Sequence, residues 1–326
     1  MTKSEWVTAS APGKFVVLGE HSVVYGKPAV VLATDRRITC SVRRSRKNTL
    51  NGTYVDLTKQ PHFNYLTRDV NYCMDFMTTS DVPSGSGMGS SAALSAALAL
   101  AIHTERGEFP TEDMLVDEAY GAELFAQGNG SPMDASACVH GGGIAINIPG
   151  SGEKELWTIS RGDRTWKVTD IDVPDLSFVI GNTGIKAPTG PQVEKIRRFK
   201  AKNGFATDII NEMGDLTLDG FSALKKKDKE YLGRLMTKDH KLLSILGVSC
   251  NELNKLVMAS LPYSYGAKLT GSGGGGCMVA LTDKPDKVAE AIKSRGGTPY
   301  IIKSGSDGAR MEVNPVNGPP MDIPMS

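Results

Sequence analysis

The chain has 326 residues, of which 40% are hydrophobic and 22% charged, and its formal net charge at pH 7 is +1. This is the composition of an ordinary soluble protein, and the length is enough for two domains. A net charge so close to zero creates no global field that would attract nucleic acid or an anionic membrane, so we exclude both as partners.

The five cysteines are widely spaced and form no CxxC pair. This pattern favours reduced thiols over a disulfide framework or a zinc site. The first 15 residues lack the apolar core of a signal peptide, and the longest apolar stretch, residues 92–102, is too short to span a bilayer. We therefore expect a cytoplasmic protein.

The first half of the chain changes from a strand pattern to a helix pattern. Short β-branched runs bounded by glycine, proline or charge predict strands at residues 15–18, 29–33 and 38–42. Apolar residues at helical spacing then predict helices at 92–103 and 112–127, followed by a strand at 142–148.

A polar span from Pro149 to Asp175 separates these elements from a second set. We place the domain boundary at its end, so that residues 1–175 form the first domain and residues 176–326 the second. The second set consists of predicted strands at 176–181, 266–270 and 277–281 and predicted helices at 193–202 and 231–246. The fold class that we expect is α+β.

Residues 83–102 read PSGSGMGSSAALSAALALAI, a glycine- and serine-rich loop that runs directly into an alanine-rich helix. Glycine lets the backbone approach a ligand closely, and a helix start offers unpaired N–H groups and a positive dipole end. Such a junction binds anions, above all phosphate. The simpler alternative is a turn with Ser90 or Ser91 as helix N-cap, but a cap needs no set of three alternating glycines. The Walker motif is absent, and the glycine spacing differs from that of the dinucleotide fingerprint.

A second glycine-rich loop, GSGGGG at residues 271–276, formally matches GxGxxG. The run CMVAL after it predicts a strand, whereas the fingerprint needs a helix there. Five glycines in six residues would be a large entropic burden for an ordinary hairpin. We therefore expect this loop to approach another surface closely, such as a bound phosphate or substrate.

Three segments together resemble the signature motifs of the GHMP kinases: SAPGKFVVLGEHSVVYGKPAV at residues 10–30, PSGSGMGSSAA at 83–93 and KLTGSGGGGC at 268–277. The first resembles the mevalonate-phosphorylating members, and the compact spacing is similar to the shorter archaeal ones. The resemblance implies an N-terminal domain of the ribosomal protein S5 domain 2 type and a ferredoxin-like C-terminal domain. ATP and the acceptor would lie in the cleft between them. The implied reaction is phosphorylation of the 5-hydroxyl of mevalonate, with ATP and Mg²⁺.

The resemblance also implies roles for individual residues. Asp134 would be the catalytic base or hydroxyl-orienting carboxylate, and Lys14 would lower the pKa of the acceptor alcohol and stabilise the transferring charge. Ser91, with Ser90 as its neighbouring alternative, and Glu123 would hold Mg²⁺. The phosphates of ATP would lie against Pro83, Gly85, Ser86, Gly87, Met88, Gly89, Ser90 and Ser91. Mevalonate would contact Lys14, Glu20, His21, Asp134, Thr183, Arg197, Gly273 and Gly274.

Several of these residues also have a plain structural interpretation. Glu123 could be a solvent-facing carboxylate on an amphipathic helix, and only its eleven-residue interval to Asp134 favours a site. The run SPMD at 131–134 is typical of a helix start with Ser131 as N-cap and Asp134 at N3, where the dipole would keep the carboxylate ionised. Lys14 follows a Pro-Gly turn and enters a buried strand, where an unused charge would be unusual. Arg197 could bind the mevalonate carboxylate or only decorate a helix.

The departures from the family pattern are Met88 in place of the commoner Leu and Ser272 in place of the commoner Ala. The presence of both Lys14 and Asp134 is unlike mevalonate 3-kinases and diphosphomevalonate decarboxylases. Two alternatives remain. The chain could be another GHMP kinase that acts on phosphomevalonate, homoserine or a sugar, or a non-catalytic metabolite sensor on the same fold. The sequence leaves open whether the chain forms a homodimer.

Overall fold

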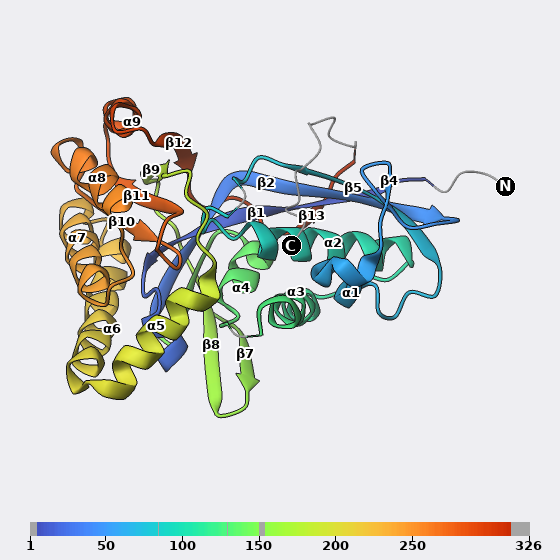
Figure 1. Ribbon diagram of the computed structural model, residues 1–326, viewed down its shortest axis with the longest axis horizontal. Coiled ribbons are helices and arrows are strands. Elements are labelled where there is room, and N and C mark those ends of the chain that lie inside the picture. The colour runs from blue at the N-terminus through green and yellow to red at the C-terminus, as the bar shows by residue number, and fades with distance from the viewer. Residues whose placement is uncertain (1–4, 84, 129, 150–153, 314–326) are drawn as a thin grey trace.

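The computed structural model describes residues 5–83, 85–128, 130–149 and 154–313, which form two β-sheets with helices packed on each (Figure 1). The strands of the larger sheet are β1 (Val7–Leu18), β2 (Ala29–Ser45), β3 (Thr49–Leu50), β4 (Thr53–Tyr54), β5 (Cys73–Ser80), β6 (Gly143–Ile146), β7 (Glu155–Arg161), β8 (Arg164–Ile171) and β13 (Arg310–Met311). The helices of this half are η1 (Ser22–Tyr25), η2 (Leu57–Lys59), α1 (Pro61–Leu66), α2 (Ser90–Glu105), α3 (Glu112–Gln127) and α4 (Met133–His140).

The smaller sheet is antiparallel, with the strand order β10-β11-β9-β12. Its strands are β9 (Ser177–Asn182), β10 (Gly266–Thr270), β11 (Cys277–Leu281) and β12 (Thr298–Lys303). The helices of this half are α5 (Thr189–Lys202), α6 (Gly204–Lys225), α7 (Lys229–Ile245), α8 (Asn251–Ser260), η3 (Leu261–Tyr263) and α9 (Pro285–Ser294). The expected α+β class is confirmed, and β10 and β11 have the predicted bounds.

Helix α2 is the central helix of the first half and lies between β1 and β2 on one side and α3 and α4 on the other (Figure 1). Every residue from Ala92 to Ala99 is buried. Small alanine side chains allow this close packing on all sides, so the helix has no polar face. A helix held in this way fixes the position of its first turn, which follows the first glycine loop.

Strands β1 and β2 differ from their predicted forms. Residues 29–33 and 38–42 belong to one 17-residue strand, because β2 pairs with β1, β5 and β6 along its length. The Pro12-Gly13 step was expected to be a turn before Lys14, which is wrong. It lies inside β1, where the register against β2 shifts between Pro12 and Lys14. A bulge of this kind re-aims the side chain that follows it.

The polar span from Pro149 to Asp175 contains a hairpin that the sequence analysis did not predict. Strands β7 and β8 pair antiparallel from Glu155 to Thr169 and extend the edge of the larger sheet. In β8 the exposed Thr165 and Lys167 alternate with the buried Trp166 and Val168, a period of two that ends at Thr169, which is also buried. The many polar side chains mask this period in the sequence.

The chain leaves the larger sheet after β8 and enters the smaller one at β9. Strand β13 returns to pair with β1, so residues 310–311 lie in the larger sheet although the predicted second domain includes them. The division at residue 175 stays a prediction. Within the described residues, no helix is long and apolar enough to cross a membrane.

Candidate active site

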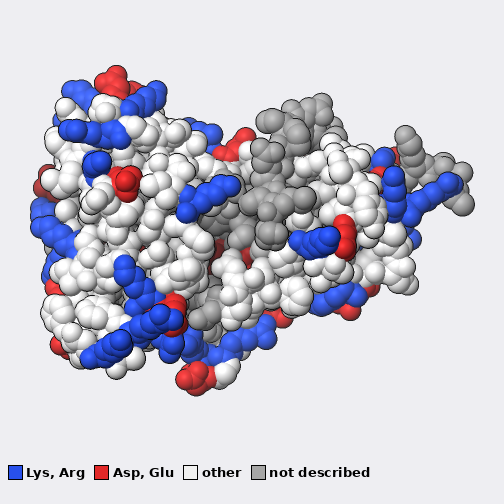
Figure 2. Space-filling view, in the orientation of Figure 1, with Lys and Arg blue, Asp and Glu red and all other residues white. Residues whose placement is uncertain are grey.

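A cavity of about 680 Å³ is lined by residues from both halves of the molecule. One wall is formed by residues 85–91 of the first glycine loop, the last turns of α3 and the start of α4. The other wall is formed by residues 186–194, which lead into α5, and by Gly271 and Ser272 of the second glycine loop. Figure 2 shows that Lys and Arg side chains gather over α5, next to this cavity.

The first glycine loop has a backbone that only glycine adopts readily. Gly85, Gly87 and Gly89 have φ angles of 65°, 77° and 71°. Gly89 is the N-cap of α2, and no side chain caps the helix, so the interpretation of Ser90 or Ser91 as N-cap is wrong. They are the first two residues of the helix and line the cavity. The first N–H groups of α2 therefore keep their capacity to bind an anion.

Three residues of this loop, Pro83, Ser86 and Met88, do not line the cavity. Ser86 Oγ donates to the carbonyl of Pro83 at 2.6 Å and accepts from the N–H of Met88 at 3.4 Å. Met88 is fully buried. These bonds shape the loop, whereas Gly85, Gly87, Gly89 and the two serines form its cavity surface.

Lys14 and Asp134 form an ion pair at the cavity, with 3.0 Å between Nζ and Oδ2. The Lys14 side chain is 2% exposed and that of Asp134 is 35% exposed, so the carboxylate is the member that a ligand can reach. Lys14 Nζ also donates to the carbonyl of Gly87 at 3.1 Å. One ammonium group thus joins the first glycine loop to Asp134.

The start of α4 differs by one residue from its predicted form. The helix begins at Met133 with Pro132 as its N-cap residue, so the prediction of Ser131 as N-cap is wrong. Proline has no side-chain oxygen to cap the helix, and the N–H groups of the first turn remain near Asp134. Asp134 still lies in the first turn of the helix.

Ser91 and Glu123 lie side by side on neighbouring helices, α2 and α3. Ser91 Oγ donates to Glu123 Oε2 at 2.8 Å, and both residues line the cavity. The other carboxylate oxygen of Glu123 contacts His62 Nε2 at 2.9 Å, and Gln127 Nε2 donates to Oε2 at 3.0 Å. His62 was not predicted, because it lies on α1, 61 residues before its partner, and no motif marks it.

His21 lines the cavity and has a positive φ of 60°, which is uncommon for a residue other than glycine. Burial lowers its pKa to about 4, so the ring is neutral at pH 7. Nε2 lies 3.0 Å from the carbonyl oxygen of Ser272, which can only accept, so Nε2 carries the proton. Nδ1 is then left as a hydrogen-bond acceptor.

Glu20 is almost fully buried at the foot of the cavity and bonds to the ammonium of Lys268. Lys268 Nζ also lies 3.3 Å from Asp239 Oδ2. Burial raises the pKa of Glu20 to about 7 and also raises that of Asp239. Two carboxyl groups thus share one ammonium, and neither Lys268 nor Asp239 was singled out from the sequence.

Four predicted substrate residues do not line the cavity. Thr183 Oγ1 donates to the carbonyl of Gly276 at 2.8 Å, and Arg197 pairs with Glu194 on the exposed face of α5. A Cβ at Gly273 would lie 2.1 Å from the carbonyl oxygen of Val248, and one at Gly274 would lie 2.3 Å from Gln192 Nε2. The structure does not bring these four to the cavity, and their contacts with a substrate stay predictions.

The second glycine loop packs against the first. A Cβ at Gly271 would lie 3.0 Å from the Cα of Gly87, and one at Gly276 would lie 3.1 Å from the carbonyl oxygen of Ser86. The surface that this loop approaches closely is therefore the backbone of the other glycine loop. Only glycine permits this contact, because any side chain would push the loops apart.

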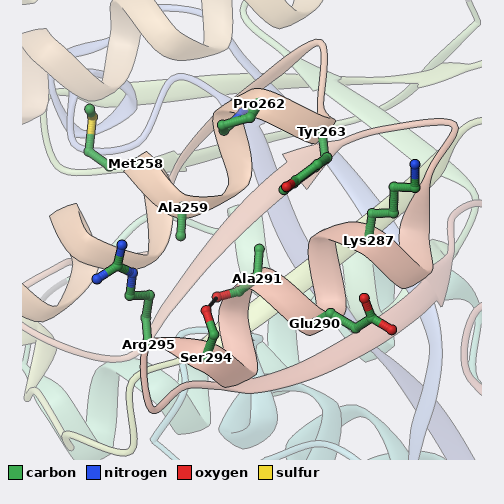
Figure 3. Close-up of a pocket in the computed structure, with 9 residues that line it drawn as sticks. All are labelled: Met258, Ala259, Pro262, Tyr263, Lys287, Glu290, Ala291, Ser294 and Arg295. Carbon is green, nitrogen blue, oxygen red and sulfur yellow. Dashed lines mark hydrogen bonds between the residues drawn. The ribbon is translucent and has the colours of Figure 1, made fainter.

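A second hollow, of about 590 Å³, lies between α8 and α9 (Figure 3). Met258, Tyr263, Lys287, Glu290 and Arg295 are among the residues that line it. None of the predicted site residues lines this hollow, and it contains no paired lysine and aspartate. We therefore assign the candidate site to the cavity that both glycine loops line.

Comparison with known proteins gives one family. The model of the GHMP kinases N-terminal domain matches residues 57–142, and that of the GHMP kinases C-terminal domain matches residues 221–298. Mevalonate kinase of Thermococcus sibiricus is 33% identical, and that of Pyrococcus furiosus is 31% identical. Each alignment covers 94% of this chain and 98% of the relative.

Solved structures share the fold. The L. major mevalonate kinase in complex with R-mevalonate superposes with a TM-score of 0.78 at 22% identity, over 92% of this chain and 96% of that chain. The Methanococcus jannaschii mevalonate kinase gives 0.73 at 23% identity, over 93% and 99%. Galactokinase of Lactococcus lactis, complexed with galactose, gives 0.72 at 15% identity, over 94% and 95%, so the fold alone does not identify the acceptor.

Proposed function

The chain belongs to the GHMP kinase family, and from this premise we propose that it transfers the γ-phosphoryl group of ATP to the 5-hydroxyl of mevalonate. The products are 5-phosphomevalonate and ADP, and the reaction serves isoprenoid synthesis in the cytoplasm. Similarity to archaeal mevalonate kinases supports this acceptor, since the alignments cover 94% of this chain and 98% of each relative. The single observation that carries the chemistry is the Lys14–Asp134 pair beside the first glycine loop.

Asp134 takes the proton of the acceptor hydroxyl or orients that hydroxyl toward the phosphorus. Its side chain is the exposed member of the ion pair, so a hydroxyl can reach its free oxygen. Lys14 stabilises the alkoxide that develops, and because its ammonium also contacts the glycine loop, it stands between the acceptor and the donor phosphate. The unpaired N–H groups at the start of α2 bind the phosphates of ATP.

Ser91 and Glu123 are the residues that would hold Mg²⁺. Their hydroxyl and carboxylate oxygens are adjacent, and hard oxygen donors are what this ion prefers. Mg²⁺ usually keeps several waters and is bound by one or two protein donors together with substrate phosphates. When bound, Mg²⁺ supplies positive charge to the donor phosphates. Hydrogen bonds from His62 and Gln127 hold the Glu123 carboxylate in place.

The acceptor side of the cavity is formed by His21 and the loop that carries it. A neutral His21 with its proton on Nε2 can accept a hydrogen bond at Nδ1 from a hydroxyl of mevalonate. Glu20 precedes it in the chain and bonds to the ammonium of Lys268. Glu20 therefore acts on mevalonate mainly by fixing the conformation of this loop.

The acceptor is tested by a coupled assay of ADP release with mevalonate, phosphomevalonate, homoserine and galactose. We expect kcat/KM for mevalonate to exceed that for each of the others by more than tenfold. A preference of that size for another acceptor would refute mevalonate as the substrate and leave the kinase chemistry standing.

The role of Asp134 is tested by Asp134→Asn. Turnover should fall by roughly two to four orders of magnitude, the usual contribution of a positioned proton acceptor, while ATP affinity stays within about twofold. Asp113, an exposed carboxylate in the first turn of α3, offers a matched control as Asp113→Asn. Equal turnover in the two variants would exclude Asp134 as the base and would mean that the base lies elsewhere or is not needed. A non-catalytic sensor would instead show no turnover in the unmodified protein.

A further inference from the structure

The segment that links β9 to α5 is fastened to the second glycine loop. The backbone N–H and the hydroxyl of Thr183 both donate to the carbonyl of Gly276, at 2.9 and 2.8 Å. In return, the N–H of Gly276 donates to the carbonyl of Ile185 at 2.8 Å. Three hydrogen bonds therefore fix the backbone immediately before Lys186, although the segment lies at the surface.

Lys186 extends from this fixed backbone across to the first glycine loop. A Cβ built on Gly85 would lie 3.3 Å from Lys186 Cγ, so the aliphatic stem of the lysine packs over that glycine. Both residues line the cavity. A side chain at Gly85 would meet this stem, and its φ of 65° would be strained as well, so glycine is what lets the lysine cross.

The charges around the cavity leave one cation without a carboxylate partner. Two lysines, Lys14 and Lys186, line the wall. Lys14 is paired with Asp134, whereas Lys186 has no ion pair with any residue that the structure describes. A triphosphate brings several negative charges to this wall, and the helix start and Lys14 together offset only part of them.

We propose that Lys186 binds the phosphate chain of the donor nucleotide, closing over it from the opposite half of the molecule. The ammonium group at the end of the stem would contact phosphate oxygens that lie on the first glycine loop. The proposal rests on the proposed function, since it needs a nucleotide donor, but it is independent of which alcohol accepts the phosphoryl group. The position of the stem over Gly85 favours the donor phosphates over the carboxylate of the acceptor.

Titration calorimetry with AMP, ADP and a non-hydrolysable ATP analogue tests this role in the full chain. Lys186→Met should weaken binding of the ATP analogue about tenfold, as expected for one charge-assisted hydrogen bond, and that of AMP less than threefold. Lys186→Arg, which keeps the charge, should recover most of the loss. Lys200→Met is the matched control, because Lys200 lies on α5 with its ammonium over the Tyr25 ring and outside the cavity wall.

The outcomes separate the two proposals. If Lys186→Met loses affinity equally for all three nucleotides, or loses none, the role of Lys186 in binding phosphate is overturned. A rise confined to the KM for mevalonate would overturn it too, and would assign Lys186 to the acceptor carboxylate. If the unmodified protein binds no ATP analogue, the kinase function itself fails. If it binds the analogue normally but phosphorylates a different alcohol, only the identity of the acceptor is wrong and the result for Lys186 stands.

Discussion

Replacing Glu20 by glutamine should make the folded protein more stable at neutral and alkaline pH. The Glu20 side chain is 2% exposed, and the Lys268 ammonium that it contacts is shared with the equally buried Asp239. Glu20 Oε2 has no hydrogen-bond partner among the described residues. Burial disfavours the charged form of the Glu20 carboxyl group, and the negative charge of Asp239 disfavours it further. The pKa of Glu20 is therefore raised to about 7 from the ordinary 4.5.

The sign follows from proton binding in the two states. Between pH 4.5 and about 7 the unfolded chain has lost the Glu20 proton while the folded protein keeps it, so stability falls as the pH rises through this range. Below pH 4.5 Glu20 is protonated in both states and costs the folded protein no stability. Above pH 7 it is ionised in both states, and the loss of stability is complete, at about 3 kcal/mol. Glutamine does not titrate. The free energy of unfolding of Glu20→Gln, minus that of the unmodified protein, should therefore rise by roughly 2–3 kcal/mol between pH 5 and pH 8.

Urea denaturation followed by circular dichroism at pH 5, 6, 7 and 8 measures this difference directly. Subtraction removes the contributions of other groups, including His140, whose pKa is raised by its bonds to Glu112 and Asp170. Glu290→Gln, on the exposed surface of α9, is the control and should give a difference that does not change with pH. A flat difference for Glu20→Gln as well would show that Glu20 is ionised in the folded protein at pH 5, and would refute the reasoning.

Two further predictions concern the backbone around the site. Gly89→Ala should lower turnover at least tenfold, with a loss in the free energy of unfolding of only about 1–2 kcal/mol. Alanine is strained at φ 71°, and its Cβ would lie 2.9 Å from Lys14 Cγ. Unchanged turnover would mean that Lys14 can move aside without cost. Thr270→Val should lower the free energy of unfolding by about 1–3 kcal/mol in urea denaturation, because Thr270 Oγ1 accepts from the buried N–H of Val16 at 3.0 Å. An unchanged value would show that this N–H finds another partner.

The parts of the site that the sequence predicts are those that lie close together in the chain or in a motif. The glycine loop and the helix after it follow from local backbone requirements. Lys14 and Ser91 lie in the family motifs, and Glu123 and Asp134 follow from the resemblance of their eleven-residue interval to that of the family. Details that depend on one residue of register, such as the start of α4, were predicted less well. The sequence places Pro132 at the first helical position, whereas the structure has it as the N-cap residue. A sequence pattern does not define a helix end to within one residue.

The partners that support these residues could not be predicted, because tertiary packing alone brings them together. His62 reaches Glu123 from a separate helix, and Lys268 reaches Glu20 across 248 residues of sequence. In a single sequence, a buried lysine in a strand looks the same as one at the surface. The family motif at residues 268–277 includes Lys268 but does not mark its partners, and the structure pairs it with two carboxyl groups.

Strand β10 explains how the second half of the molecule controls the acceptor side of the cavity. Side chains alternate along a strand, so Lys268 and Thr270 point the same way, toward the first half. Lys268 bonds to Glu20 and Thr270 to the backbone of Val16, and two residues further the carbonyl of Ser272 accepts from His21. All three contacts reach β1 or the loop after it, and this loop carries the acceptor residues Glu20 and His21. The Lys14–Asp134 and Ser91–Glu123 pairs, in contrast, lie wholly in the first half. Substitutions in β10 should therefore raise the KM for the acceptor before they affect nucleotide binding.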